Sequence, residues 1–217
     1  MDTKLAKEQI CAFGKRMYEL GFANANDGNI SVRVSNQEIW ITPTGVSKGF
    51  LTPDLLVATD LDGNVAEGGR NPSSEFKMHL EVYRNRPDIH CVMHAHPPIS
   101  TAFAVCRRPL DKSYLPEGIV SLGWVPVTEY ATPSTQAVPE SIRPFLADHN
   151  ALLLANHGVL TWDTDVTGAF FKLQTVEYLA QIYLYVDQIG NPVELEKEEV
   201  ERLLSLRGFY RQYANVK

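Results

Sequence analysis

In the segment ISVRVSNQEIWIT, residues 30–42, apolar and polar side chains alternate on both sides of the polar triplet Ser35-Asn36-Gln37. Alternation with period two is typical of strands with one buried face, and two such runs around a short polar turn indicate a β-hairpin. Residues 55–59 and 65–66 flank the turn sequence LDGN and indicate a second hairpin. Since tight turns join antiparallel strands, these hairpins predict a largely antiparallel sheet.

Outward from the hairpins, the sequence predicts helices and further strands. Apolar spacing and capping residues predict helices at 3–20, from 72 to about 85, 99–105, 135–147, 166–189 and 196–207. Short apolar runs predict strands at 89–93, 124–127, 151–155 and 159–162. Helices before, between and after the strands indicate an α/β fold, with one central, mostly antiparallel sheet between helical layers. We expect residues 1–217 to form a single domain.

The composition is typical of a globular protein with a sizeable core. The 217 residues are 44% hydrophobic and 21% charged, with a formal net charge of −6. A mildly acidic chain without a basic cluster argues against nucleic-acid binding. No apolar run reaches the ~18 residues of a membrane span, and the polar start, MDTK, is unlike a signal peptide. Three cysteines without CxxC spacing are typical of reduced thiols, so we expect a cytoplasmic protein.

Two histidines one residue apart end the apolar run in VMHAHPP, residues 92–98. In a strand, residues i and i+2 point to the same face, with α-carbons about 6.6 Å apart, so His94 and His96 can converge on one ion. His157 also ends an apolar strand, and Gly158 after it allows a tight turn. Three histidines with one position left open are typical of a catalytic zinc site. The alternative is a chance pair of core or surface histidines.

The other three histidines carry a weaker signal. His79 and His90 stand alone in or beside regular elements, and His149 lies in the polar turn DHN. We interpret all three as structural or exposed.

Three polar turns offer hydrogen-bond donors to an anion. Glu75 follows Ser73 and Ser74 at a predicted helix start, where a serine N-cap and free backbone N–H groups form a common phosphate site. Asp27-Gly28-Asn29 precedes a strand, and TPTG, residues 42–45, follows one. Each is an ordinary turn sequence by itself, and a carboxylate near a helix N-terminus is favoured on electrostatic grounds alone. Together with the histidines, the turns predict a phosphorylated substrate held beside zinc.

Five motifs occur in the order seen in the class II aldolase/adducin family, which the chain resembles over essentially its whole length. They are GNISVR at 28–33, TPTG at 42–45, PSSE at 72–75, HAH at 94–96 and NHG at 156–158. The resemblance implies an α/β/α sandwich with a mostly antiparallel sheet, and a homotetramer with active sites between subunits. It implies Zn²⁺ bound by three histidines, with a glutamate as fourth ligand and acid/base: His94, His96, His157 and Glu75. It also implies a phosphate site at Gly28, Asn29, Thr44, Gly45, Ser73 and Ser74.

Two tyrosines resemble residues of the same family. Tyr114 falls where the aldolases place a tyrosine that reaches into the adjacent subunit's site, which makes it a candidate catalytic residue. Tyr210 resembles the tyrosine of the aldolase tail and is a candidate for substrate binding, although Tyr213 is close by. After Tyr114 the chain reads LPEGIV in place of the family's glycine-rich segment. This departure lies where the aldehyde half of the substrate would contact the protein, and it leaves the exact sugar open.

The resemblance implies zinc-dependent cleavage of a ketose 1-phosphate to dihydroxyacetone phosphate and a small aldehyde. L-Fuculose 1-phosphate, which gives L-lactaldehyde, and 5-deoxyribulose 1-phosphate are the expected substrates. The alternatives are L-ribulose-5-phosphate 4-epimerase, methylthioribulose-phosphate dehydratase and deoxypentulose-phosphate aldolase activities. Epimerase sequences typically carry aspartate where this chain has Glu75, which favours the aldolase. A non-catalytic, adducin-like binding module predicts lost metal ligands, and all three histidines are present.

Overall fold

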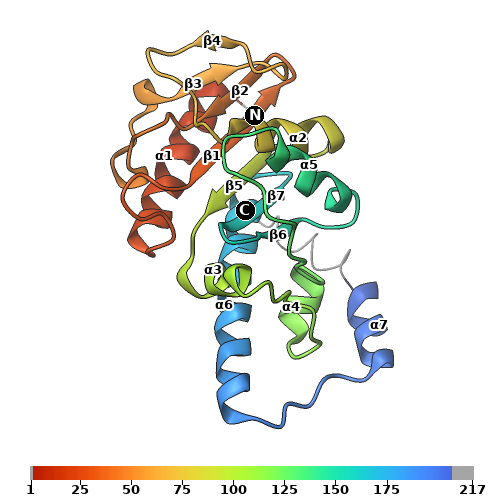
Figure 1. The fold of residues 1–217 in the computed structure, drawn as a ribbon. Helices are drawn as coiled ribbons and strands as arrows, with labels where there is room; N and C mark the ends of the chain where they lie inside the picture. The colour runs from red at the N-terminus through yellow and green to blue at the C-terminus, as the bar shows by residue number, and fades with distance from the viewer. Residues whose placement is uncertain (1, 207–217) are drawn as a thin grey trace.

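A seven-stranded antiparallel sheet forms the centre of the computed structural model, which describes residues 2–206 (Figure 1). The strands are β1 (Asn29–Ser35), β2 (Glu38–Ile41), β3 (Val57–Thr59), β4 (Val65–Glu67), β5 (Cys91–Ala95), β6 (Ala151–Leu154) and β7 (Gly158–Asp163). Their order is β4-β3-β2-β1-β5-β7-β6, and every neighbouring pair is antiparallel. The two predicted hairpins are confirmed as β1–β2 and β3–β4.

Seven α-helices and three short 3-10 helices accompany the strands in the described part of the chain. The α-helices are α1 (Thr3–Glu19), α2 (Phe76–Asn85), α3 (Pro98–Val105), α4 (Pro116–Ser121), α5 (Ala137–Ile142), α6 (Val166–Ile189) and α7 (Lys197–Ser205). The 3-10 helices are η1 (Lys48–Phe50), η2 (Pro53–Leu55) and η3 (Arg143–Phe145). The side chains of Asp2 and Asp165 cap α1 and α6 by accepting a backbone N–H of the first turn.

The helices form two layers, one on each face of the sheet (Figure 1). On one face, α1, α3 and α6 bury apolar side chains against strand residues such as Val32 and Met93. On the other face, α2 and α5 pack over Ile39, Val92 and Trp162. Successive strand residues point to opposite faces, so Val92 and Met93 belong to different core layers. The predicted α/β/α sandwich with an antiparallel sheet is therefore confirmed.

The predicted strand at 124–127 is wrong. Val125 and Val127 form isolated bridges to two different partners, one antiparallel and one parallel. Pro126 between them has no N–H to donate, so a continuous ladder cannot run through this segment. The helix predicted at 135–147 is also shorter, because it ends at Ile142 and continues only as the proline-containing turn η3.

Helix α4 was not predicted from the sequence. Its interior holds Gly118, which disfavours helix formation relative to other residues. A Cβ at this position would lie 2.9 Å from the side chain of Leu179 in α6, so glycine allows the two helices to pack closely. Packing with α6 and α7 stabilises a segment whose intrinsic helix propensity is low (Figure 1).

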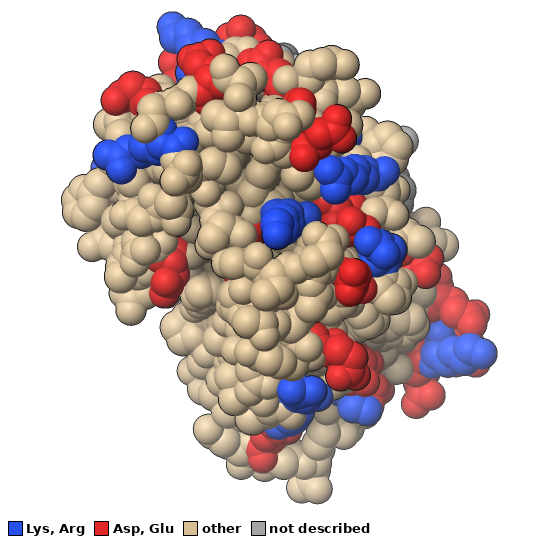
Figure 2. Space-filling view, turned by 45° about the horizontal axis from the view of Figure 1, so that its top comes forward, with Lys and Arg blue, Asp and Glu red and all other residues tan. Residues whose placement is uncertain are grey.

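Charged side chains of both signs are interspersed on the face of the molecule shown in Figure 2, with uncharged areas between them. Several exposed ion pairs join residues one helical turn apart, such as Lys4 with Glu8 and Lys15 with Glu19. Pairs of this kind contribute little to stability, typically about 0.3–0.5 kcal/mol each. Within residues 2–206, no helix has both the length and the apolar character needed to span a membrane.

Candidate metal centre

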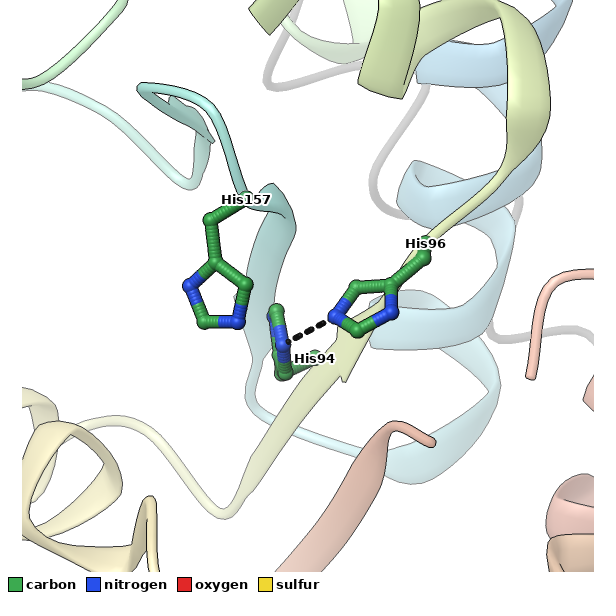
Figure 3. A group of neighbouring side chains, drawn as sticks. All are labelled: His94, His96 and His157. Carbon is green, nitrogen blue, oxygen red and sulfur yellow. Dashed lines mark hydrogen bonds between the residues drawn. The ribbon is translucent and has the colours of Figure 1, made fainter. Parts of the chain in front are cut away.

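Three histidines meet at one end of the sheet (Figure 3). His94 lies in β5, His96 follows the end of that strand, and His157 lies in the turn that joins β6 to β7. Antiparallel pairing sets His94 opposite Leu160 of β7, so the end of one strand meets the beginning of the other. The ligand atoms of the three imidazoles all lie within 4.8 Å of one another. The fold thus brings together the three histidines that the sequence singled out.

The turn that carries His157 has a tightly constrained backbone. Asn156 has a positive φ of 56°, a conformation that asparagine tolerates better than most residues. The His157 N–H donates to a carbonyl group of β6 and closes the turn. A Cβ at Gly158 would lie 2.5 Å from the Ala95 carbonyl oxygen and 2.5 Å from Cδ2 of His96. Glycine is therefore needed where the turn passes the second histidine.

Hydrogen bonding determines which nitrogen of His94 faces the cluster. Its Nδ1 lies 2.9 Å from the Val159 carbonyl oxygen, which can only accept, so Nδ1 carries the proton and Nε2 keeps its lone pair. This Nε2 lies 2.9 Å from Nε2 of His96 (Figure 3). Burial, together with unfavourable electrostatic interactions with His94 and His157, lowers the pKa of His96 to about 4, so its ring is neutral near neutral pH. Neutral imidazole is the form of histidine that binds metals.

The carboxylate of Glu75 completes the cluster. Its Oε2 lies 3.3 Å from Nε2 of His94, and its Oε1 lies 3.0 Å from Nε2 of His157. The buried Oε1 nevertheless has no hydrogen bond of normal geometry within residues 2–206. Lone pairs of several nitrogen and oxygen atoms that face one small space repel one another unless a cation or protons lie between them. Nitrogen ligands with one carboxylate fit a divalent metal such as zinc.

Glu75 is the N-cap residue of α2, so the prediction of a serine N-cap is wrong. Its side chain makes no cap hydrogen bond, because the carboxylate is directed to the histidines instead. Burial raises the pKa of Glu75, but electrostatic interactions and hydrogen bonds with the rings of His94 and His157 outweigh burial and hold this pKa well below its ordinary value. The carboxyl group is therefore ionised near neutral pH, as a metal ligand must be.

The three polar turns lie at the same end of the sheet as the histidines. Strand pairing sets Asn29, at the start of β1, opposite His94. The turn after β2 and the segment before α2 are joined by two backbone hydrogen bonds of 3.1 Å, in which Thr44 and Ser73 donate their N–H groups. The prediction of a free backbone donor is therefore wrong for Ser73. The hydroxyl groups of Thr44, Ser73 and Ser74 remain as side-chain donors in this region.

The turn before β1 passes very close to the strand that carries His94. Gly28 has a positive φ of 73°, and a Cβ there would lie 2.9 Å from the His94 carbonyl oxygen. Gly45, in the turn after β2, also has a positive φ of 74°. Both positions favour glycine, and only Gly28 combines this conformation with a close approach to the metal-site strand.

Of the two predicted tyrosines, the structure describes only Tyr114. Tyr114 precedes α4, and its ring packs against Tyr183 of α6 with the ring centroids 4.9 Å apart. This contact lies within one chain, so a contribution of Tyr114 to a neighbouring subunit's site stays a prediction. Tyr210, like Tyr213, lies outside the described residues.

The sequence analysis did not recognise His79 as part of this region. The residue is fully buried, and its Nε2 lies 2.5 Å from the Asn29 side chain, which also contacts Glu75. His79 follows Glu75 by four residues, a spacing that places two side chains on the same face of a helix. That spacing was the available signal, and its meaning depended on knowing that Glu75 faces the metal site.

The sequence analysis also missed Lys48. This residue is 1% exposed, and its Nζ donates to the carbonyl oxygens of Asn26, at 2.9 Å, and Val46, at 2.6 Å. The two bonds tie the turn before β1 to the turn after β2. Burial lowers the pKa of Lys48 to about 8. No sequence pattern predicts such a role, because lysine side chains are rarely buried.

Comparisons with known proteins agree with this geometry. Residues 8–184 match the family described as Class II Aldolase and Adducin N-terminal domain. The chain belongs to the class II aldolase/adducin family. A 5-deoxy-D-ribulose 1-phosphate aldolase from Bacillus thuringiensis serovar kurstaki is 36% identical over 200 residues, covering 91% of this chain and 92% of the relative. An L-fuculose phosphate aldolase from Methanococcus maripaludis is 34% identical over 174 residues, covering 80% of this chain and 92% of the relative.

A solved structure supports the same assignment. An L-fuculose 1-phosphate aldolase matches this fold with a TM-score of 0.87 and 35% sequence identity, covering 94% of this chain and 97% of that chain. The resemblance to the class II aldolase/adducin family seen in the five motifs is confirmed. As a class II aldolase, the protein is a carbon–carbon lyase, and its three clustered histidines fit the metal site of that class.

Proposed function

We propose that this class II aldolase is a zinc enzyme that cleaves a ketose 1-phosphate to dihydroxyacetone phosphate and a small aldehyde. The observation that carries the proposal is the Glu75 carboxylate in contact with both His94 and His157. Aldol cleavage requires a positioned acid/base group beside a Lewis acid. Relatives named as 5-deoxy-D-ribulose 1-phosphate aldolase and L-fuculose phosphate aldolase support a phosphorylated ketose as the substrate.

In this reaction the bond between C3 and C4 of the ketose breaks. The C4 hydroxyl loses its proton and becomes the aldehyde oxygen, and the electron pair of the broken bond stays on the other fragment as an enediolate. Zinc, held by His94, His96 and His157, would supply Lewis-acid stabilisation of this negative charge, on the order of several kcal/mol. Glu75, which is ionised at the start, takes up the proton lost by the C4 hydroxyl and delivers it to C3, which completes dihydroxyacetone phosphate. The Tyr114 hydroxyl of the partner subunit relays this proton, accepting from the C4 hydroxyl as it donates onward, or orients the aldehyde oxygen.

The phosphate group is proposed to bind in the polar turns. The proposed contacts are Gly28, Asn29, Thr44, Gly45, Ser73 and Ser74. Hydrogen bonds from neutral donors to a dianion are charge-assisted and therefore stronger than those to a neutral hydroxyl group. We accordingly expect unphosphorylated ketoses to be poor substrates.

The aldehyde end of the substrate is proposed to meet a mostly apolar wall that includes Tyr114 and Leu115. An apolar pocket discriminates one methylene group by only about 1–3 kcal/mol, so related deoxy sugars compete closely. L-Fuculose 1-phosphate is our first choice, because the methyl group of its product L-lactaldehyde suits such a wall. The ketose 5-deoxyribulose 1-phosphate is the second choice, and the name of the Bacillus relative supports it.

Steady-state kinetics with three compounds tests the proposal. We expect dihydroxyacetone phosphate to be released from L-fuculose 1-phosphate and from 5-deoxyribulose 1-phosphate, and the higher kcat/KM identifies the preferred sugar. L-Ribulose 5-phosphate serves as the comparison. If only this pentulose reacts, and its product is the C4 epimer without release of a triose, the aldolase proposal is wrong.

A further inference from the structure

A continuous series of buried hydrogen bonds, here called the buried relay, runs from the metal site into the core. It links, in order, Glu75, Asn29, His79, Ser31 and Tyr83. Asn29 Nδ2 donates to Glu75 Oε2 at 3.1 Å, and Asn29 Oδ1 lies 2.5 Å from His79 Nε2. On the other side of the ring, His79 Nδ1 lies 2.7 Å from Ser31 Oγ, which lies 2.8 Å from the Tyr83 hydroxyl.

The middle of the buried relay is closed to solvent. His79 and Ser31 are fully buried, and Asn29 and Tyr83 are 2% and 1% exposed. Water cannot replace a lost partner at such positions, so each polar atom must be satisfied by another protein group. Burial, with an unfavourable electrostatic interaction with His94, lowers the pKa of His79 to about 3, so its ring is neutral and offers one N–H and one lone pair.

The donors and acceptors of the buried relay are compatible with one direction only. With Asn29 Nδ2 facing the Glu75 carboxylate, its Oδ1 faces the ring of His79. Oδ1 can only accept, so Nε2 of the neutral ring carries the proton and Nδ1 keeps the lone pair. Nδ1 then accepts from the Ser31 hydroxyl, and the Tyr83 hydroxyl donates to Ser31 Oγ or to the Ser31 carbonyl oxygen 3.0 Å away.

The opposite orientation of the Asn29 side chain is unfavourable at both ends. A flipped amide would place Oδ1 against the ionised Glu75 carboxylate, where two acceptors repel each other. It would also turn the amide hydrogens towards the Nε2–H of His79, where two donors meet. A change of the ring tautomer could relieve only the second conflict, since the Ser31 hydroxyl can accept from Nδ1–H as well as donate to Nδ1. The repulsion between Asn29 Oδ1 and the Glu75 carboxylate would remain.

We propose that His79 is a positioning residue of the active site, whose Nε2–H fixes the Asn29 side chain so that its amide group donates to the Glu75 carboxylate. Through this contact, a histidine buried between helix and sheet determines the orientation of the acid/base group beside the three metal ligands. His79 does not touch the substrate or the reacting atoms. The proposal rests on the proposed function only for the choice of substrate in the kinetic test.

Two variants with matched chemistry separate positioning from general stability. His79→Gln keeps a donor near the place of Nε2, whereas His79→Asn keeps only a polar group near the place of Nδ1. We expect His79→Asn to lower kcat about tenfold, the equivalent of about 1.4 kcal/mol, and His79→Gln to recover most of this loss. Metal content per chain should match the wild type in both, and His149→Gln, in a turn outside the buried relay and the metal site, should leave kcat unchanged.

A purely structural role makes a different prediction. It lowers the unfolding temperature of both variants but leaves kcat per metal-loaded chain equal to that of the wild type, and this result overturns the proposal. Coupling provides a second criterion, since residues that act through one another have non-additive effects. In an Asn29→Ala background, we expect His79→Asn to cause no further loss of kcat, and additive losses count against the proposal.

The tautomer of His79 can be measured without any substrate. In protein labelled with ¹⁵N-histidine, we expect the His79 ring to carry its proton on Nε2, with the signal identified by its absence in His79→Gln. A proton on Nδ1 overturns the proposal, whichever sugar phosphate the enzyme cleaves. Absence of aldolase activity in a wild-type sample with the Nε2–H tautomer would instead count against the proposed function.

Discussion

The proposed function gives the carboxylate of Glu75 two roles, metal binding and proton transfer. Its two oxygens contact His94 and His157, and Asn29 donates to one of them. A group with both roles must be ionised before the substrate binds and must be able to carry a proton during the reaction. Interactions with the neighbouring histidine rings meet the first requirement, because they hold the pKa of Glu75 below its ordinary value despite burial.

A Glu75 variant that cannot carry a proton should separate the two proposed roles of this residue, metal binding and proton transfer. We expect Glu75→Gln to retain the metal but to lower turnover about 10²-fold or more, the usual range for a positioned acid/base group. The amide has nearly the same size as the carboxylate but cannot accept the proton. The measurement is kcat together with the metal content of the same sample. Turnover close to that of the wild type would remove Glu75 from the proton transfer.

Loss of one imidazole should abolish metal binding. We expect His157→Ala to lose the metal and the activity together, because a catalytic zinc site usually needs three protein ligands. His157 lies in a turn between two strands, so the sheet should keep its fold. Metal analysis of purified protein gives the result, and a circular dichroism spectrum like that of the wild type is the control. Full metal occupancy in His157→Ala would disprove the assignment.

The turn between β6 and β7 positions a metal ligand through its backbone. In Gly158→Ala, the new methyl group would lie 2.5 Å from the Ala95 carbonyl oxygen and from His96, so one of them must move. We expect weaker metal binding and a loss of about 1–3 kcal/mol in the free energy of unfolding, as for other overpacked sites. Metal titration and denaturant unfolding measure the two effects.

Gly69→Ala is the matched control for this substitution. A Cβ at Gly69 has no atom within 4 Å, and its φ lies outside the range that favours glycine. Both metal affinity and unfolding should therefore stay close to wild type. Equal effects of the two substitutions would show that crowding at Gly158 is not the cause.

The elements that the sequence predicted are those with a strong local pattern. The alternation of apolar and polar residues at 30–42 predicted the first hairpin, and the apolar spacing at 166–189 predicted α6 and its bounds. Helix α4 could not be predicted, because tertiary packing around Gly118 stabilises it against its low intrinsic propensity. The segment 124–127 has the composition of a strand, but Pro126 prevents a continuous ladder.

In the site, too, some residues could be predicted from local sequence patterns, whereas others depend on the tertiary structure. His94 and His96 were predicted because residues two apart in one strand point to the same face. His157 was predicted because it also ends an apolar strand. The buried relay through His79 and the bonds of Lys48 join segments that are distant in sequence. Only the register of β1 against β5, which sets Asn29 beside His94, brings the relay to the metal site. That register is a property of the folded sheet.

An oligomer is the expected functional form of the whole molecule. Tyr114 packs on Tyr183 within its own chain, so its proposed role requires a second subunit. The outer face of α6 presents Phe171, Tyr178 and Tyr185, which are each about half exposed and recur every seven residues. We expect light scattering of active protein to give a tetramer of 24.3 kDa chains. An active sample at the monomer mass would contradict a shared site.

Mixed subunits provide a direct test of sharing. Glu75→Gln and Tyr114→Phe should each have low activity alone. Mixed, unfolded together and refolded, they should regain part of the wild-type activity, because some interfaces then combine an intact Glu75 with an intact Tyr114. No recovery in refolded mixtures of confirmed oligomeric state would indicate that both residues serve the site of their own chain.

The position of β5 in the sheet has a consequence for the synthesis of this protein. The strand lies between β1 and β7, and β7 begins only at Gly158. On the ribosome, β5 therefore emerges well before its second partner, and the backbone N–H and C=O groups along one edge of this apolar strand stay unpaired during that interval, open to other nascent chains. His157 emerges immediately before the strand that closes this edge. Capture of the metal and protection against aggregation thus become possible at the same late moment of translation, and a chain truncated earlier has neither.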